Sequence, residues 1–346
     1  MRRLTSPAGV LVVAAALLAA AQARKQASCP QAAFLMPCRC IEASIGLRIL
    51  CSGIRSTHHL EVPFSYLRAY DLNALTLQHV NFSITVDLFK GLNVVTIKIL
   101  HSTFRVSPMQ GHNDATIVFG SMLQGLDVRH TDLDLGDAHL GATDSLRHVM
   151  VDTSTIEVLR RNWFHGLTRL KSFSIENTRI ERVEDEALSG LDSVEEIKLP
   201  SNRLQKVRRT YFPQLASNLR HLDLSDNELT SLPSDMFENM PVLESVTLSR
   251  NHFQTLSPEP WKPMLGQLRL VTLDGSKLST KELLRQPLAT DWSPHRDLVT
   301  WLVLDVPMSK TTRSTATEPS RGCCRATPGT KSVARAQRPR IWLAHG

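Results

Sequence analysis

The amino-acid sequence predicts an α/β-type solenoid with a parallel β-sheet on a concave side and irregular or short-helical segments on a convex side. Three observations support this fold class. An apolar motif recurs along most of the chain, the apolar residues at its centre alternate as they do in a strand, and a polar residue follows all but the first of these strands at one position. Repeats of this kind indicate a stack of similar turns.

The motif is clearest in the stretch LRHLDLSDNELTSLP, residues 219–233. It reads L-x-x-L-x-L-x-x-N-x-L, and weaker copies precede and follow it. Consecutive copies are 22 to 29 residues apart, and the longest step contains SPMQGHNDA, which indicates a loop insertion. Copies begin at residues 72, 94, 123, 146, 170, 194, 219, 243 and 268. We therefore predict about nine repeats within residues 61–285.

Each repeat supplies one short strand, because the last three positions of L-x-x-L-x-L alternate between core and solvent. A single strand cannot bury its apolar face alone, so neighbouring turns stack into a continuous sheet over a continuous core. The polar residue at the N position, which we call the Asn slot, turns the chain away from the strand. Its amide can pair with backbone groups of adjacent turns that would otherwise be buried without partners.

The residue in the Asn slot changes along the chain. A full amide is present in Asn202, Asn227 and Asn251, whereas earlier slots hold hydroxyls and the first holds an aliphatic residue. These earlier slots are Val80, Ser102, Thr131, Ser154 and Thr178. We therefore predict a less regular ladder of hydrogen bonds in the N-terminal half.

The two ends of the chain differ from its body. Arg2 and Arg3 precede the apolar run GVLVVAAALLAAA and a small-x-small site, so residues 1–23 are interpreted as a signal peptide of a secreted, extracellular protein. No later apolar stretch is long enough for a membrane span. Residues 306–346 contain eight basic residues and one acid, and we interpret them as a basic disordered tail.

The formal net charge of +7 resides in these ends, and the body is nearly neutral. Nucleic-acid binding is therefore not predicted. A contact of the basic tail with acidic glycans is a possible additional role.

Four cysteines cluster in a predicted N-terminal cap, residues 24–60, and the body from residue 52 to residue 322 contains none. An even cluster behind a signal peptide favours two disulfides. A zinc site is the alternative, but the spacing lacks the Cys-x2-Cys pairs that zinc prefers.

The repeats and the stretch CPQAAFLMPCRCIEASIGLRILCSG resemble the extracellular leucine-rich-repeat proteins with a cysteine-flanked N-terminal cap. The wide first cysteine spacing resembles secreted arthropod members, which include the non-catalytic leucine-rich-repeat subunit of the Oplophorus luciferase. The resemblance covers about residues 29–302 and implies a leucine-rich-repeat horseshoe. It also implies that Cys29 pairs with Cys40 and Cys38 with Cys51.

The C-terminal end of the body departs from that family. The stretch TDWSPHRDLVTWL resembles the beginning of a cysteine-flanked C-terminal cap, but Pro-His-Arg stands where the family has Cys-Asp-Cys. Residues 286–305 are therefore predicted to form a degenerate C-terminal cap without a disulfide.

No catalytic signature occurs in the sequence, so we predict no enzyme activity and no cofactor. The acids of the stretch at residues 223–228 suggest a calcium loop, but core leucines interrupt the ligand spacing and no glycine is near. A surface remains as the candidate site. The outward strand residues proposed to bind are Thr96, Lys98, Asp127, His148, Met150, Ser174, Glu196, Lys198, His221, Asp223 and Thr247.

Two further features lie beside the predicted sheet. His79, His101 and His130 occupy the position before the Asn slot in three successive repeats, so their rings should form a column at one rim. Solvated rim histidines are the simplest interpretation, and a transition-metal site or a pH-sensitive patch is the alternative. Asn81 begins the sequon Asn-Phe-Ser and is a predicted glycosylation site.

These observations predict a secreted, non-enzymatic protein that binds a protein ligand through its concave face. A non-catalytic stabilising subunit of a secreted enzyme complex is one alternative. An ectodomain-like fragment of a leucine-rich-repeat receptor is another.

Overall fold

The computed structural model of the chain describes residues 28–106, 116–141, 144–264, 267–278 and 300–301. The predicted signal peptide, the predicted tail and nearly all of the predicted C-terminal cap lie outside these ranges. The chain divides into two units, Met1–Asp305 and Val306–Gly346, and every described residue belongs to the first.

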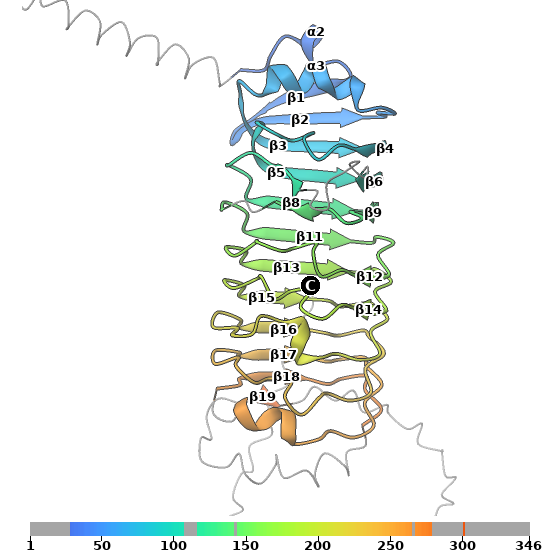
Figure 1. Cartoon of the computed structure of the whole chain (residues 1–346), viewed down its shortest axis with the longest axis vertical. Helices are drawn as coiled ribbons and strands as arrows, with labels where there is room; N and C mark the ends of the chain where they lie inside the picture. The colour runs from blue at the N-terminus through green and yellow to red at the C-terminus, as the bar shows by residue number, and fades with distance from the viewer. Residues whose placement is uncertain (1–27, 107–115, 142–143, 265–266, 279–299, 302–346) are drawn as a thin grey trace, which may run out of the picture. The chain divides into compact units, whose positions relative to one another are not determined.

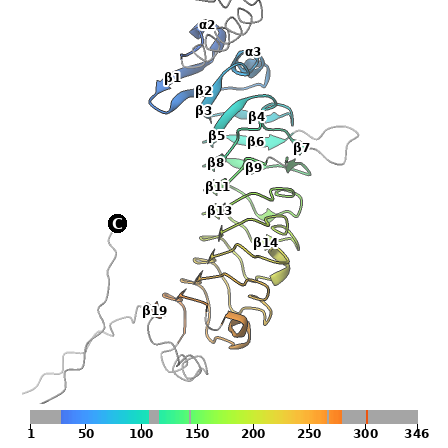
Figure 2. The same ribbon diagram turned by 90° about the vertical axis from the view of Figure 1, so that its left-hand side faces the viewer.

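Within the described residues, one 12-stranded sheet runs through the whole stack of turns (Figure 1). Its first two strands form an antiparallel hairpin, and every later neighbour pairs in parallel. Figure 2 shows the sheet on the inner side of the curved stack. The predicted solenoid with a concave parallel sheet is therefore confirmed. In sheet order the strands are β1 (Cys38–Ala43), β2 (Gly46–Ser52), β3 (Asp71–Gln78), β5 (Asn93–Leu100), β8 (Gly125–Arg129), β11 (His148–Asp152), β13 (Ser172–Glu176), β15 (Glu196–Lys198), β16 (His221–Asp223), β17 (Ser245–Thr247), β18 (Leu270–Thr272) and β19 (Thr300–Trp301).

The remainder of each turn returns through short segments and small sheets that the sequence pattern did not predict. One small sheet contains β4 (Asn81–Ile84), β6 (Thr103–Val106) and β9 (Asp132–Asp134), and two pairs join β7 (Thr116–Ile117) to β10 (His139–Leu140) and β12 (Val158–Leu159) to β14 (Arg182–Val183). The described helices are α2 (Ala32–Leu35), α3 (His58–Leu67), η1 (Arg209–Tyr211) and η2 (Glu259–Met264).

The apolar positions of the motif form the core. Leu219, Leu222, Leu224 and Leu229 each retain at most 1% of their surface, and the equivalent positions of the neighbouring turns are also buried. Burial of one such side chain contributes about 1.5–3 kcal/mol of transfer free energy. Because each turn buries its leucines against the turns on both sides, the core is continuous along the stack.

A left-handed residue precedes the Asn slot in every turn of the stack, and we call this row of positions the rim row. Ten residues share this place and have φ between 48° and 68°. They are Gly53, His79, His101, His130, Thr153, Asn177, Ser201, Asp226, Arg250 and Gly275. Since the backbone turns in the same way each time, the side chains of the rim row leave the solenoid on one side.

In the N-terminal half the residues of the Asn slots make fewer side-chain hydrogen bonds than in the C-terminal half, but the strands are longer. Strands β3 and β5 are eight residues long, whereas strands β15 to β18 have three each. The small sheet of β4, β6 and β9 adds a second row of backbone bonds directly after the slot. The ladder of side-chain hydrogen bonds is therefore less regular in the N-terminal half, as predicted. The longer strands there provide backbone hydrogen bonds in place of those that the missing amides would make.

The N-terminal cap covers the first turn with a hairpin and two helices. Disulfides join Cys29 to Cys40 and Cys38 to Cys51, which is the pairing that the resemblance implied. Helix α3 buries Leu60, Phe64 and Leu67 against the core, and it runs across the predicted domain boundary at residue 60.

At the other end, Thr300–Trp301 joins the sheet as its last strand, in parallel with β18. This pairing places part of the predicted C-terminal cap on the edge of the stack. None of the helices in the described ranges has both the length and the apolar character needed to cross a bilayer.

Candidate functional site

The outward residues of the strands form two columns along the concave sheet. Backbone pairing sets their order, because each member lies opposite its counterpart in the next strand. The first column contains Ala74, Thr96, Gly125, His148, Ser172, Glu196, His221, Ser245 and Leu270. The second contains Thr76, Lys98, Asp127, Met150, Ser174, Lys198, Asp223, Thr247 and Thr272. All eleven predicted binding residues thus lie on one surface.

These residues differ in how much of their side chain is exposed to a partner. His148, His221 and Leu270 are exposed, and most of the others are partly buried. Ser174 was predicted as a binding residue but retains only 6% of its surface, which corrects that prediction. Its hydroxyl donates to Glu176, and its neighbours in the column are the long side chains of Met150 and Lys198.

Charges near the N-terminal end of this surface are paired with each other. Arg129 Nε donates to Asp127 at 2.7 Å, and Lys98 Nζ lies 3.8 Å from the same carboxylate. The hydrogen bond and the charge of Asp127 raise the pKa of Arg129, with smaller contributions from Asp152 and Glu176.

Arg129, Asp152 and Glu176 form a third outward column that the sequence analysis missed. The strands β8, β11 and β13 extend one residue beyond the last apolar position of the motif, so the same alternation carries one more outward position. Continued alternation after the last motif leucine was the signal that could have revealed it.

A second charged group lies at the middle of the sheet. Lys198 Nζ lies 2.7 Å from Glu196, and Ser172 Oγ donates to the same carboxylate at 3.1 Å. Burial alone would raise the pKa of Glu196, but the hydrogen bond and charge of Lys198, together with Ser172, bring this pKa below its ordinary value. The concave face is thus polar, with compensating charges, rather than dominated by one sign.

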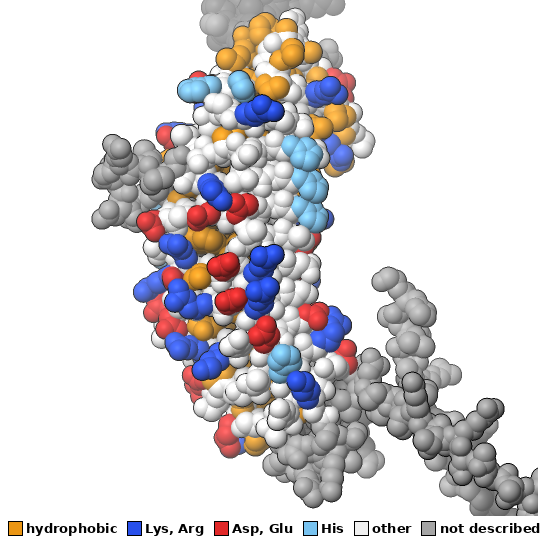
Figure 3. Space-filling model, turned by 90° about the vertical axis from the view of Figure 1, so that its right-hand side faces the viewer, with side chains coloured by type: hydrophobic (Ala, Val, Ile, Leu, Met, Phe, Trp, Pro, Cys, Tyr) orange, Lys and Arg blue, Asp and Glu red, His pale blue; other side chains and the backbone are white. Residues whose placement is uncertain are grey.

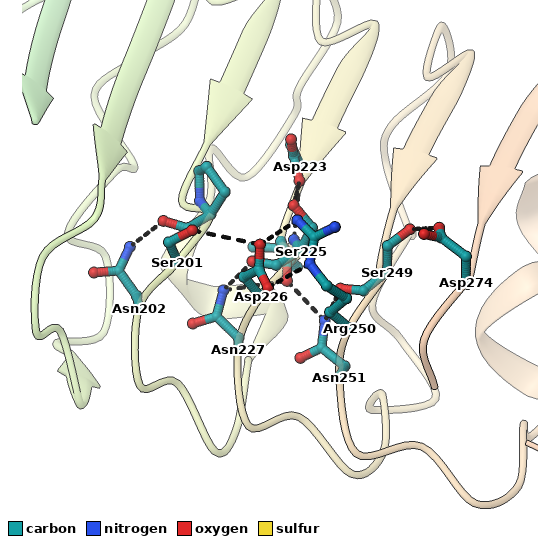
Figure 4. A network of polar contacts seen from close by, with 12 residues as sticks. Ser201, Asn202, Asp223, Ser225, Asp226, Asn227, Ser249, Arg250, Asn251 and Asp274 are labelled. Carbon is teal, nitrogen blue, oxygen red and sulfur yellow. Dashed lines mark hydrogen bonds and ion pairs between the residues drawn. The ribbon is translucent and has the colours of Figure 1, made fainter. Parts of the chain in front are cut away.

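The acidic stretch at residues 223–228 does not gather its oxygens around one point (Figure 4). Asp223 accepts hydrogen bonds from the backbone and side chain of Ser225, and Asp226 pairs with Arg250 of the next turn. The hydrogen bond from Arg250 lowers the pKa of Asp226. Within the described ranges no three acidic, histidine or cysteine side chains are placed to hold a metal ion. The calcium interpretation is therefore not supported.

Asn227, also in Figure 4, belongs to the ladder that connects successive turns. Its Oδ1 accepts from Leu204 N at 3.0 Å, and its Nδ2 donates to Leu199 O at 2.9 Å. Asn202 and Asn251 repeat this arrangement one turn before and one turn after. These three residues are buried and serve the fold, so they are not available to a ligand.

His79, His101 and His130 form a column of stacked rings at the rim row, visible as a line of pale-blue side chains in Figure 3. The ring centroids are 5.6 Å apart for the first pair and 4.8 Å for the second, and the planes differ by 22° and 3°. Nearly parallel rings direct their nitrogens along parallel lines, so the lone pairs do not converge on one ion. Among the described residues these histidines do not form a group that could hold a metal ion, so the alternative of a transition-metal site is not supported.

Asn81 begins strand β4, and its side chain is exposed. Its backbone N–H donates to Ile54 O at 3.2 Å, and Ser83 of the same sequon is also exposed. The sequon is therefore accessible, and its glycosylation stays a prediction.

Comparison with known families agrees with this geometry. The model of the family described as leucine rich repeat matches residues 144–204, 192–253 and 217–278. Residues 144–278 are thus similar to leucine-rich repeats. The match includes the three turns with an amide in the Asn slot, and the N-terminal turns continue the same stack in the structure.

Several curated proteins share this sequence pattern at low identity. Osteomodulin of Bos taurus is 24% identical over 177 residues, which are 50% of this chain and 40% of osteomodulin. Toll-like receptor 3 of Boselaphus tragocamelus is 30% identical over 117 residues, 33% of this chain and 13% of the receptor. Human leucine-rich repeats and immunoglobulin-like domains protein 3 is 29% identical over 160 residues, 46% of this chain and 14% of that protein. The chain thus spans less than half the length of these relatives.

Proposed function

We propose that this protein is a secreted, non-enzymatic leucine-rich-repeat protein that holds a protein ligand on its concave sheet. The observation that carries the proposal is the continuous surface of two in-register columns, which presents exposed His148 and His221 among polar, charge-compensated neighbours. Concave faces of solenoids commonly serve as binding surfaces because they surround a partner over many turns.

The position of the ligand can be tested with added glycans, since a glycan on the sheet blocks any partner there. Ser172→Asn creates a sequon with Ser174, and Ser245→Asn creates one with Thr247, each by a single substitution on the first column. Leu215→Asn creates a matched sequon with Ser217 on an exposed loop before β16, away from the sheet.

The expected result is that the wild type co-purifies a stoichiometric protein from native extracellular fluid. The Leu215 variant should retain that partner, and both sheet variants should lose it, once mass spectrometry confirms that each new site carries a glycan. Retention of the partner by both glycosylated sheet variants would contradict the concave-face proposal.

The identity of the captured protein also separates the alternatives. A stoichiometric enzyme would favour the stabilising-subunit role suggested by the resemblance to secreted arthropod members. One relative is named a receptor, so a longer transcript that encodes a membrane segment would instead favour a receptor ectodomain.

A further inference from the structure

The histidine column of the rim row combines stacked rings with an exposed position and a fixed backbone spacing. Its rings stack face to face, and His79 Nε2 lies 3.4 Å from Gln78 Nε2. All three side chains are exposed. The backbone holds their spacing, because His79 N donates to Leu100 O, His101 N to Arg129 O and His130 N to Asp152 O.

Protonation of this column places like charges about one strand spacing apart. Imidazole is the side chain that ordinarily changes charge between pH 5 and 8. Cations at ring separations of 4.8 and 5.6 Å repel each other, and a nearby anion would relieve this repulsion. The question is therefore whether the protein itself supplies that anion.

The carboxylates around the column are already engaged. Asp127 pairs with Lys98 and Arg129, and Asp132 pairs with Arg105 and accepts from Thr155. On the following elements, Asp152 accepts from Thr153 and Asn177, and Asp134 accepts from Gly136 N. Arg55 is exposed on the turn between β2 and α3. Asp152 and Asp134 accept only from uncharged groups and keep their negative charge, but among the described residues none of these carboxylates forms an ion pair with His79, His101 or His130.

We infer that the rim formed by His79, His101 and His130 binds a sulfated polysaccharide when the column is protonated. A linear polyanion suits the geometry, because parallel rings offer a row of donors rather than one converging pocket. A sulfate ester stays ionised over the whole range in which imidazole titrates, whereas carboxyl groups begin to protonate towards its lower end. The rim also lacks a free backbone edge for a peptide strand, because the three rim amides are bonded to the next turn.

This site is separate from the concave face and from the basic tail. It would hold the protein on a sulfated matrix in acidic surroundings and release it at neutral pH, while the sheet remains free for its own ligand. The two proposals therefore depend on different residues and can be tested separately.

The test uses the full secreted chain and fluorescein-labelled dextran sulfate, with fluorescence anisotropy at pH 5.5 and 7.4 and constant 0.15 M salt. We expect the wild type to bind at least tenfold more tightly at pH 5.5. His79→Asn, His101→Asn and His130→Asn combined should remove this pH dependence. Asparagine suits the backbone there, since Asn177 occupies the rim row with φ 51°.

Two further variants control for general effects of charge and folding. His148→Asn with His221→Asn removes exposed histidines from the sheet and should leave the tenfold change intact. The triple exchange His79→Arg, His101→Arg and His130→Arg should bind at pH 7.4 as well, because the charge is then permanent. Arginine is also accepted in this row, as Arg250 with φ 53° shows.

Three outcomes would overturn the inference: equal wild-type affinity at both pH values, retained pH dependence in the asparagine variant, or equal binding of polyglutamate. The last outcome would assign the rim to acidic polypeptides instead. None of these outcomes bears on the glycan-blocking test of the concave face.

Discussion

Replacement of Asn227 offers a direct measure of what the Asn ladder contributes. Asn227→Ala removes one acceptor and a donor group that serves three carbonyls, those of Leu199, Leu224 and Ser225. Each carbonyl keeps another donor, which is Asn202 Nδ2, Asn251 Nδ2 and Ser201 N respectively. The N–H of Leu204, by contrast, has Asn227 Oδ1 as its partner among the described residues.

The expected cost follows from this difference. An orphaned buried donor costs about 1–3 kcal/mol, and each lost bond to a carbonyl that keeps another donor costs about 0.5 kcal/mol. We therefore expect Asn227→Ala to lower the free energy of unfolding by about 3–4 kcal/mol.

The chain itself provides a matched comparison. In earlier turns Ser102 Oγ accepts from Val80 N at 3.1 Å, and Thr131 Oγ1 donates to Arg129 O at 2.8 Å. Val80 is itself a slot residue, whereas Leu204 lies two residues after the slot residue Asn202, so a threonine at position 227 keeps the bond to Ser225 O but not the one to Leu204 N. Asn227→Thr should therefore cost about 2–3 kcal/mol, slightly less than alanine.

Urea unfolding with intact disulfides measures the total effect, and hydrogen exchange at the Leu204 amide measures the local one. We expect protection of this amide to fall strongly in both variants, because neither alanine nor threonine replaces the amide oxygen that accepts from Leu204 N. If either variant leaves Leu204 as protected as in the wild type, the proposed role of the amide as an acceptor for the preceding turn is wrong.

Three further predictions concern the packing, the charges and the cap. A Cβ at Gly120 would lie 1.8 Å from Leu92 O, so Gly120→Ala should destabilise the protein by about 3 kcal/mol or more, whereas Gly136→Ala, with φ +58° and open space, should cost about 1 kcal/mol by thermal unfolding. Arg250 lowers the pKa of Asp226, so the ion pair stabilises above the ordinary Asp pKa of about 3.9 and this contribution is lost as pH falls below it. Asp226→Asn should therefore cost under about 1 kcal/mol at pH 7 and nothing at pH 2, with the exposed Asp137→Asn as a control, and a constant difference at all pH values would contradict the assignment. Loss of the buried Cys38–Cys51 disulfide should cost about 3 kcal/mol and more than loss of Cys29–Cys40, as measured by limited proteolysis of the cap, and equal proteolysis of both double-alanine variants would refute that order.

The periodic part of the fold could be predicted from the sequence because each core leucine has a local signature. The spacing around Leu222 and Leu224 determines a strand, and its recurrence determines a stack. The pairing register of the two concave columns follows from the same period, so the positions of Lys98 and Asp223 were predictable before any coordinates.

Features that depend on contacts between turns were not predictable in this way. The left-handed backbone at the rim row occurs at His79 and Arg250 as well as at Gly53 and Gly275, so residue type gave no signal. The burial of Ser174 depends on the length of its neighbours rather than on its own polarity. The distribution of ion pairs, such as Asp226 with Arg250, depends on rotamers that a single sequence does not specify.

The rim row has a consequence for how such a surface changes through mutation. Eight of its ten members are not glycine, and a left-handed conformation costs each of them about 1 kcal/mol or more. Exchange of one such residue for another leaves that cost nearly unchanged, so the row can acquire new chemistry without a new penalty to folding. Its side chains meanwhile keep the strand spacing of about 4.8 Å. A ligand with a repeating structure would therefore be selected first by the length of its repeat, and only then by the identity of the side chains that it meets.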